Sequence, residues 1–179
     1  MPDHIQETKN WIVNVIVGYN FCPFAKREVL RDSIHYQVEE TTDLMVALQT
    51  LLVECQRLDE EESMETAFVL YPNTFKTFKR YLKFLDLAEA LLIHQEYEGT
   101  YQLASFHPEY CFADAEADDP ANYTNRSPYP MLHIIREESL EAALKSYKEP
   151  ESIPERNIRV AREMGLAKMQ DLLKDCYKH

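Results

Sequence analysis

The six residues TAFVLY, at Thr66–Tyr71, form a short and almost wholly apolar run. A continuous apolar run of this length is typical of a strand covered on both faces, whereas a half-exposed strand alternates apolar and polar residues. Pro72 follows and ends the run. We therefore expect a central strand at this position.

Three further segments have strand patterns. Residues 34–39 alternate apolar and polar side chains, which indicates a half-buried strand. The segments TYQLASF at 100–106 and MLHII at 131–135 are short, apolar and bounded by turn residues. Together with 66–71, they predict a sheet of four strands.

Three segments, 5–17, 44–58 and 75–92, carry apolar residues at helical spacing and predict helices. Pro23, the cap residues and Gly165 predict further helices near 24–30, 139–144, 152–165 and 166–176. Gly18 is expected to end the first helix, because glycine is common just after a helix.

Polar residues mark the expected starts of four of these helices, and Ser139 is the expected cap of the fifth helix. Thr41 or Thr42 can cap the third, and Asn73 can cap the fourth. Ser152 and Glu155 have the spacing of a capping box for the sixth.

The resulting order, ααβαβαββααα, places helical crossovers between the first three strands and so favours parallel pairing among them. The pairing of the fourth strand stays open. We expect one α+β or mixed α/β domain over residues 1–179, with a four-stranded sheet and helices packed on it.

Charge and composition limit the classes of partner. The 179 residues include 19 Lys and Arg against 31 Asp and Glu, a formal net charge of −12, which repels nucleic acid and anionic lipid. No run of Lys and Arg stands out, so we expect neither partner. The beginning of the sequence has no signal-peptide pattern and no segment reaches the ~20 apolar residues of a membrane helix, so we expect a cytoplasmic protein. The oligomeric state is left open.

Cysteine and glycine usage bears on cofactors. The four cysteines are widely spaced, and free thiols are expected in a reducing compartment. Three glycines leave no Gly-rich phosphate loop, and no cofactor is predicted. A metal site can be drafted from His107, Cys111 and Asp114, but zinc sites need three or four protein ligands. We predict no metal site.

Cys22 is the first candidate site residue. It precedes Pro23, a residue favoured in the first turn of a helix, so Cys22 is expected at a helix start. First-turn amides, with Lys26 and Arg27 nearby, stabilise a thiolate and make it nucleophilic. The alternative is a small packed hydrophobe between two phenylalanines.

The segment from His107 to Pro130 is the second candidate. It lacks apolar periodicity, and a loop of more than ~12 residues in a compact domain is usually functional or disordered. Its second half, 122–130, is polar and stiffened by prolines, so we expect an ordered loop that brings Arg126 towards His107 and Cys22. Arg126 suits an anion clamp, and the alternative is a guanidinium that bonds loop carbonyls.

Three stretches carry a family resemblance: NFCPFAK at 20–26, LASFHPEYCFAD at 103–114 and DDPANYTNRSPYPMLHIIRE at 118–137. They resemble the bacterial family known as domain of unknown function 1415, over nearly the whole chain. The resemblance implies no particular reaction, substrate or cofactor. Cys111 departs from the family, which commonly has a polar residue there. The family pattern includes Cys22, Pro23, His107, Pro108, Asn122, Thr124, Asn125, Arg126, Pro128, Tyr129 and Pro130.

Three hypotheses of function follow. The first, narrowly preferred, is an enzyme with a Cys22 thiolate, proton transfer by His107 and an anionic substrate held by Arg126. Its expected substrate-binding residues are Asn122, Thr124, Asn125 and Tyr129. The second is a non-catalytic module that binds a small anion or a protein. The third is a metalloprotein that uses His107 with carboxylates.

Overall fold

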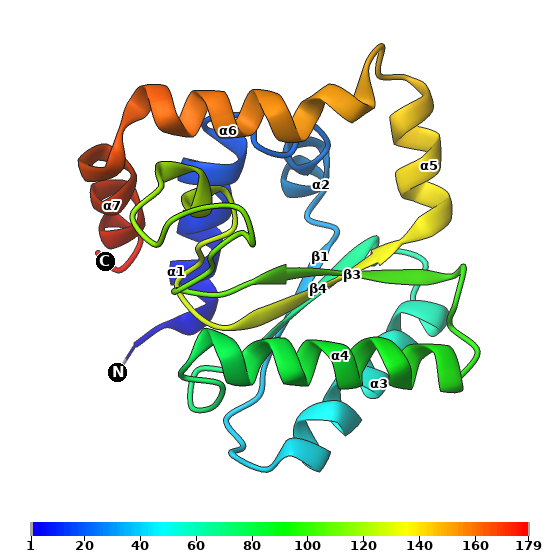
Figure 1. The fold of residues 1–179 in the computed structure, drawn as a ribbon. Helices are drawn as coiled ribbons and strands as arrows, with labels where there is room; N and C mark the ends of the chain where they lie inside the picture. Colours follow the sequence, from blue (N-terminus) through cyan, green and yellow to red (C-terminus); the bar gives the residue numbers. More distant parts are fainter. Residues whose placement is uncertain (1, 179) are drawn as a thin grey trace.

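A mixed sheet forms the middle layer of the structure, a computed structural model that describes residues 2–178 (Figure 1). The strands are β1 (Ile34–Val38), β2 (Thr66–Leu70), β3 (Tyr101–Phe106) and β4 (Met131–Arg136). Each lies at a predicted segment, and the expected α+β fold with a four-stranded sheet is confirmed.

The strand order is β1-β2-β4-β3. β1 and β2 are parallel, as the helix between them favours. β4 lies between β2 and β3 and is antiparallel to both, so the expected parallel pairing of the first three strands holds only for β1 and β2. The long loop before β4 lets the chain return beside β2. All five residues of β2 are buried, as predicted for a central strand.

Helices occupy the predicted segments, with three short helical turns among them. They are α1 (His4–Trp11), the π-helix η1 (Ile12–Val17), α2 (Ala25–Arg31), α3 (Leu44–Glu60), α4 (Phe78–His94), η2 (Pro120–Thr124), α5 (Glu137–Lys145), η3 (Pro150–Ser152), α6 (Ile153–Met164) and α7 (Leu166–Asp175). Within residues 2–178, no helix combines the length and the apolar character needed to cross a membrane.

The fourth helix begins later than the sequence suggests. Thr77 caps α4, whereas Asn73 was the expected cap. Phe75 has a φ of +54°, in the left-handed region, and a residue with that torsion cannot belong to a right-handed helix. The segment between β2 and α4 is therefore a shaped turn.

The caps of α3, α5 and α6 also differ from expectation. α5 begins at Glu137, so Ser139, its expected cap, lies inside the helix. Asp43, and not one of the two threonines before it, caps α3 by accepting hydrogen bonds from two first-turn amides. Ser152 precedes α6, but its hydroxyl donates to the carbonyl of Glu149, so the capping box with Glu155 is not formed.

The first predicted helix is divided, because α1 passes into the π-helix at Ile12. Gly18 ends it as expected, but with a φ of −57°, in the right-handed region. A Cβ atom on Gly18 would lie 2.4 Å from the carbonyl oxygen of Asn14. The close approach of the backbone, and not a left-handed torsion, therefore requires glycine there.

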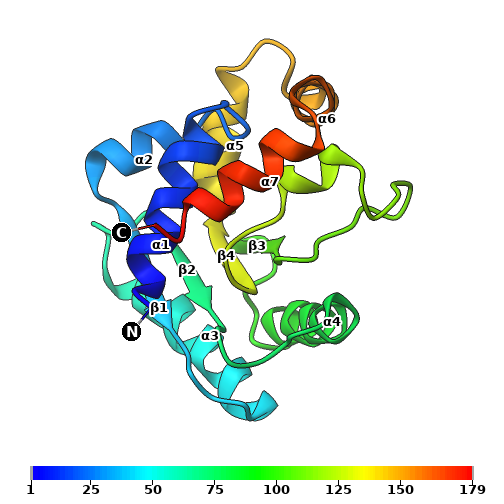
Figure 2. The ribbon, with the colours of Figure 1, turned by 90° about the vertical axis from the view of Figure 1, so that its left-hand side faces the viewer.

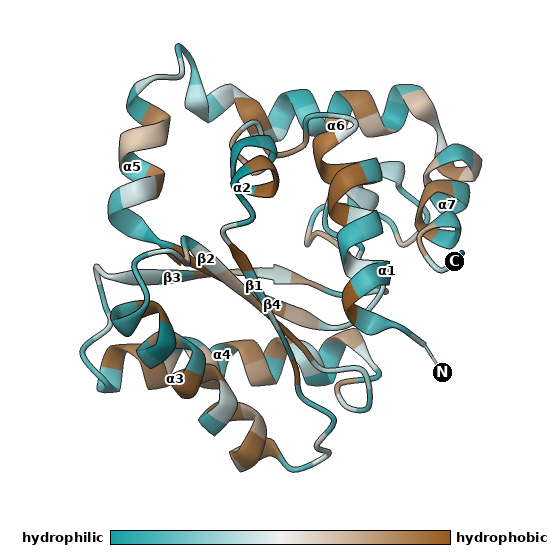
Figure 3. Cartoon of the chain, turned by 180° about the vertical axis from the view of Figure 1, so that it is seen from behind, coloured by the Kyte–Doolittle hydropathy of each residue, from teal (hydrophilic) through white to brown (hydrophobic). Residues whose placement is uncertain are grey.

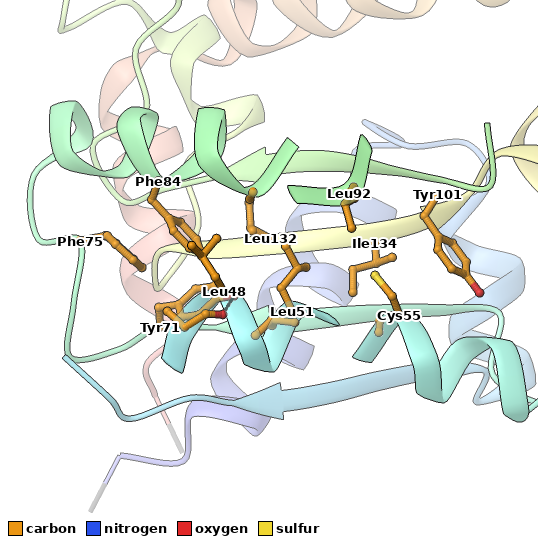
Figure 4. Packing of buried hydrophobic residues seen from close by; sticks show 14 of the residues in the cluster. Leu48, Leu51, Cys55, Tyr71, Phe75, Phe84, Leu92, Tyr101, Leu132 and Ile134 are labelled. Carbon is orange, nitrogen blue, oxygen red and sulfur yellow. Dashed lines mark hydrogen bonds between the residues drawn. The ribbon is translucent and has the colours of Figure 1, made fainter. Parts of the chain in front are cut away.

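Two hydrophobic cores lie on opposite faces of the sheet, since alternate residues of a strand point to opposite sides. Ala67 and Val69 of β2 belong to the first core, with α3 and α4, and Figure 4 shows part of it. Phe68 and Leu70 belong to the second core, with α1, η1, α6 and α7. Figures 1 and 2 show the two groups of helices on either side of the sheet, and Figure 3 shows apolar stretches on the strands and on helices of both groups.

Candidate functional site

The carboxyl ends of three strands meet at one edge of the sheet. β1 is parallel to β2, and β4 is antiparallel to both β2 and β3, so β1, β2 and β3 run in one direction. The segments 39–43, 71–77 and 107–130 follow these strand ends. Ligands of α/β proteins commonly bind outside the carboxyl ends of strands. Side chains of these segments are therefore the first candidates for a site.

His107 lies directly after β3, and its side chain is 1% exposed. Its Nδ1 accepts a hydrogen bond of 2.9 Å from the amide of Glu109, and its Nε2 lies 2.8 Å from the carbonyl oxygen of Phe75. Because Nδ1 accepts, Nε2 carries the proton and donates it, so the imidazole is neutral. Burial lowers the pKa of His107. The ring joins the loop after β3 to the turn after β2.

Arg126 connects three parts of the loop. Its Nε donates to the carbonyl of Tyr110 at 2.9 Å, and its Nη2 donates to the carbonyl of Ala117 at 2.8 Å. The guanidinium also lies 4.7 Å from the ring centroid of Tyr123. Arg126 thus has the carbonyl-bonding role that the sequence left open beside the role of anion clamp.

Two other predicted site residues are hydrogen-bonded within the loop. Asn122 is fully buried, and its carboxamide accepts from the amide of Phe112 at 3.0 Å and donates to the carbonyl of Glu116 at 2.8 Å. The hydroxyl of Thr124 donates to the carbonyl of Ala121 at 2.9 Å. These bonds shape the loop.

Asn125 and Tyr129 attach the loop to the rest of the domain. The carboxamide of Asn125 donates to the carbonyl of Ser105 in β3 at 3.1 Å. The hydroxyl of Tyr129 donates to the carboxylate of Glu7 in α1. Burial, together with the Glu7 carboxylate, raises the pKa of Tyr129. Both residues therefore have structural partners.

Cys22 lies just before a helix, though not within its first turn, because α2 begins at Ala25. The amides of Phe24 and Ala25 bond the thiol and lower its pKa, as the sequence suggested. Burial against the second core has the larger effect, and the pKa of Cys22 is raised above its ordinary value. The thiol is therefore less ionised at neutral pH than an exposed cysteine, contrary to expectation.

The predicted site residues do not all share contacts. The amide of His107 donates to the carbonyl of Asn125 at 3.3 Å, so the loop folds back next to Arg126. The ring of His107 lies 5.1 Å from that of Tyr81, in the first core, whereas Cys22 packs on the second core. These contacts are on opposite faces of the sheet. A shared site of Cys22, His107 and Arg126 stays a prediction.

The possible metal ligands His107 and Cys111 form hydrogen bonds within the protein. Both ring nitrogens of His107 are hydrogen-bonded, and the thiol of Cys111 donates to the carbonyl of Ala115 at 3.4 Å. Among residues 2–178, no three His, Cys, Asp or Glu side chains are grouped so that they could hold a metal ion.

A groove of about 180 Å³ lies at the same edge of the sheet, between the start of α3 and the first turns of α4. Phe75 and Phe84 are among the residues that line it, and Figure 4 shows both at the end of the first core where α4 begins. Thr74, Arg80 and Lys83 supply polar groups. The described residues that line the groove include no Asp or Glu.

The wall of this groove contains the left-handed Phe75. A left-handed torsion at a non-glycine residue costs of order 1–3 kcal/mol and persists only where the surroundings enforce it. The ring of Phe75 stacks on Phe84 with centroids 4.1 Å apart, and its carbonyl accepts the hydrogen bond from His107. Strain of this kind concentrates at functional sites. His107 thus fixes the groove wall.

The polar groups in the groove are free of internal partners. Thr74 is 8% exposed, yet its hydroxyl forms no hydrogen bond with any residue in the described range 2–178. Arg80 and Lys83 are exposed, and their side chains form no ion pair with the described part of the chain. A hydroxyl and two cations are therefore available to a ligand.

The model of one protein family, Protein of unknown function (DUF1415), matches residues 3–171 of the 179-residue chain. The chain belongs to this family. The resemblance expected from the NFCPFAK, FHP and NRSPYP stretches is thereby confirmed, and both the loop and the groove lie inside the matched range. No curated protein and no solved structure matches the chain.

The groove residues of this DUF1415 chain were not predicted from the sequence, although their cluster of cations is visible there. Residues 76–83 read KTFKRYLK, with four cations and no acidic residue in a chain of net charge −12. The cations are interleaved with aromatic and apolar core residues, so they do not form a continuous run. Only the helix places Arg80 and Lys83 together beside Thr74.

Proposed function

We propose that this DUF1415 domain is a non-catalytic binding module for a small anion, and that the anion binds in the groove between α3 and α4. The observation that carries the proposal is the combination of two unpaired cations, Arg80 and Lys83, with the free hydroxyl of the buried Thr74. The hydroxyl of Thr74 can donate to a ligand or accept from one, and the two cations attract an anion.

The charge of the whole chain supports a small anion over a polyanion. A net charge of −12 disfavours the approach of an extended polyanion to the chain as a whole. A small anion contacts only the residues that line the groove, and these include no carboxylate. The local field at Arg80 and Lys83 therefore favours a compact ligand.

His107 has a place in this proposal as a positioning residue. Its Nε2 holds the carbonyl of Phe75, and Phe75 is part of the groove wall. The ring is too buried and too fully bonded to meet a ligand directly. Its contribution to binding is therefore indirect.

A thiolate enzyme is the second candidate, and one observation favours it: the amides of Phe24 and Ala25 bond the thiol of Cys22. Burial outweighs these bonds and raises the pKa of that thiol, which opposes the chemistry. Alkylation of Cys22 with iodoacetamide as a function of pH separates the candidates. An apparent pKa above that of an ordinary thiol favours the binding module, and one well below it favours the enzyme.

The test of the binding module is calorimetric titration with a panel of small anions, such as acetate, phosphate and sulfate, and with their neutral analogues. We expect saturable binding of at least one anion, weakened roughly tenfold or more in the double variant Arg80→Gln with Lys83→Gln. Lys79→Gln is the matched control, because Lys79 is an exposed cation of the same helix that does not line the groove. Equal loss of binding in the control, or no binding by the wild type, contradicts the proposal.

A further inference from the structure

The groove is apolar as well as cationic. Phe75 and Phe84 are 5% and 1% exposed and pack into the core below it. Leu44 of α3 and Leu87 of α4 line it as well, and they are 40% and 46% exposed. Covering apolar surface of this kind stabilises a complex in proportion to the area removed from water. A ligand with an apolar body therefore gains energy here that an inorganic anion cannot.

The size of the groove limits that body. Its volume is about 180 Å³, and an apolar cavity of about 150 Å³ accommodates a benzene ring. One aromatic ring or a short branched chain therefore fits together with a small charged group.

The polar groups of the groove can hold a carboxylate. Phosphate sites at helix ends use free main-chain amides of the first turn. At the start of α3, the amides of Met45 and Val46 already donate to Asp43. Arg80 supplies a guanidinium that can bond both oxygens of a carboxylate, and Thr74 supplies a hydroxyl.

We infer that the ligand of this groove is an amphipathic monocarboxylate, with an aryl or branched-chain body over Phe75 and Phe84 and its carboxylate between Arg80 and Thr74. The inference rests on the proposed function and adds the chemical class of the anion. The two exposed leucines enclose the body, and Lys83 adds the second positive charge.

The test compares four probes on the intact chain by calorimetry or ligand-observed NMR. Phenylacetate has both the carboxylate and the apolar ring, and acetate has the carboxylate alone. Phenylacetamide has the ring with a neutral amide, and inorganic phosphate has a different anionic group and no ring. We expect phenylacetate to bind roughly tenfold or more tightly than each of the other three. Leu87→Asn, a change at a half-exposed position, should weaken phenylacetate several-fold and leave acetate unchanged.

Thr74→Val and Arg80→Gln test the head group. Both should reduce the preference for phenylacetate over phenylacetamide, while Lys79→Gln should keep it. If phosphate or acetate binds as tightly as phenylacetate and the Arg80→Gln/Lys83→Gln variant still loses that binding, the inferred ligand class is wrong. The proposed function of a small-anion binding module is then still supported. If phenylacetamide equals phenylacetate, the carboxylate assignment is overturned. If no anion binds at all, the proposed function fails together with this inference.

Discussion

The loop at 107–130 and the groove above Phe75 lie at the same edge of the sheet, but their polar side chains are used in opposite ways. In the loop, Arg126 and Asn122 bond backbone groups of neighbouring residues. In the groove, Thr74 and Arg80 have no such partners within residues 2–178. The loop has the more unusual sequence, but the polar side chains of the groove are more available to a ligand.

This difference shows what a polar, proline-rich loop needs in order to be ordered. Such a loop has no regular ladder of backbone hydrogen bonds, and its buried carbonyls and amides must find partners elsewhere. The side chains that look most suited to a ligand, Asn and Arg, are also those best able to supply these bonds. Conspicuous donors in a loop are therefore weak evidence for a site until their partners are known.

The largest effect that separates the two regions is expected for Arg126→Ala. This change removes the bonds to the carbonyls of Tyr110 and Ala117 and the contact with the ring of Tyr123. Hydrogen bonds to a charged group contribute about 1.5 kcal/mol or more each, and less where the bond is exposed, as is the one to Ala117. We therefore expect a loss of about 2–3 kcal/mol in the free energy of unfolding. Urea unfolding followed by circular dichroism measures it.

The matched change in the groove is Arg80→Ala, which should alter the free energy of unfolding by less than about 0.5 kcal/mol, because the side chain is exposed and unpaired. A small loss for Arg126→Ala together with weaker anion binding would restore the anion-clamp role expected from the sequence. Similar large losses for both variants would remove the distinction between loop and groove.

A second prediction concerns acid and the histidine that joins the two regions. Burial lowers the pKa of His107, and burial also lowers the pKa of His133 in β4 to about 3. Below pH ~6.5 the unfolded chain takes up protons at both histidines while the folded chain does not. Stability is therefore full above that pH and falls as the pH falls towards the folded values. We expect a loss of about 2 kcal/mol or more between pH 7.5 and pH 5 from these groups.

Unfolding in urea at a series of pH values checks this expectation. His133→Gln should flatten the decline, because glutamine does not take up a proton in this pH range. Its amide can still bond the hydroxyl of Thr66, which now lies 2.6 Å from Nε2 of His133. His107→Gln should flatten it less and should also weaken anion binding, since Phe75 loses its anchor. Stability that rises on acidification over this range would show that the two imidazoles gain protons on folding.

The fold was largely predictable because it depends on patterns that repeat over several residues. TAFVLY predicted the buried central strand, and the helical spacing of apolar residues predicted α1, α3 and α4. The start of α4 was not predictable, because the left-handed torsion of Phe75 arises from its stacking on Phe84 and its bond to His107. Those partners are distant in sequence.

The site was less predictable for the same physical reason. The sequence identified His107 and Arg126 as unusual, but it could not show that their polar atoms are bonded to carbonyls of Phe75 and Tyr110. Burial of Cys22, which reverses the expected direction of its pKa shift, depends on the packing of a core built from both ends of the chain.

The smallest effect uses a matched pair of threonines, one in each region. Thr124 is 7% exposed and its hydroxyl donates to the carbonyl of Ala121 at 2.9 Å, whereas Thr74 is 8% exposed and bonds no residue between 2 and 178. Valine has nearly the shape of threonine, so Thr→Val at each position tests the hydroxyl alone. Removing a bonded hydroxyl costs about 1 kcal/mol, and we expect that loss for Thr124→Val. Thr74→Val should change the free energy of unfolding by no more than about 0.5 kcal/mol, and in the stabilising direction if either, because an unbonded hydroxyl is replaced by a methyl group.

Anion affinity should show the reverse order, with Thr74→Val weaker and Thr124→Val unchanged. Both quantities come from thermal unfolding with and without the anion, since a ligand that binds only the folded chain raises its melting temperature. Equal stability losses in the two variants would mean that Thr74 has an internal role, and the groove would then lose the free hydroxyl on which its assignment depends.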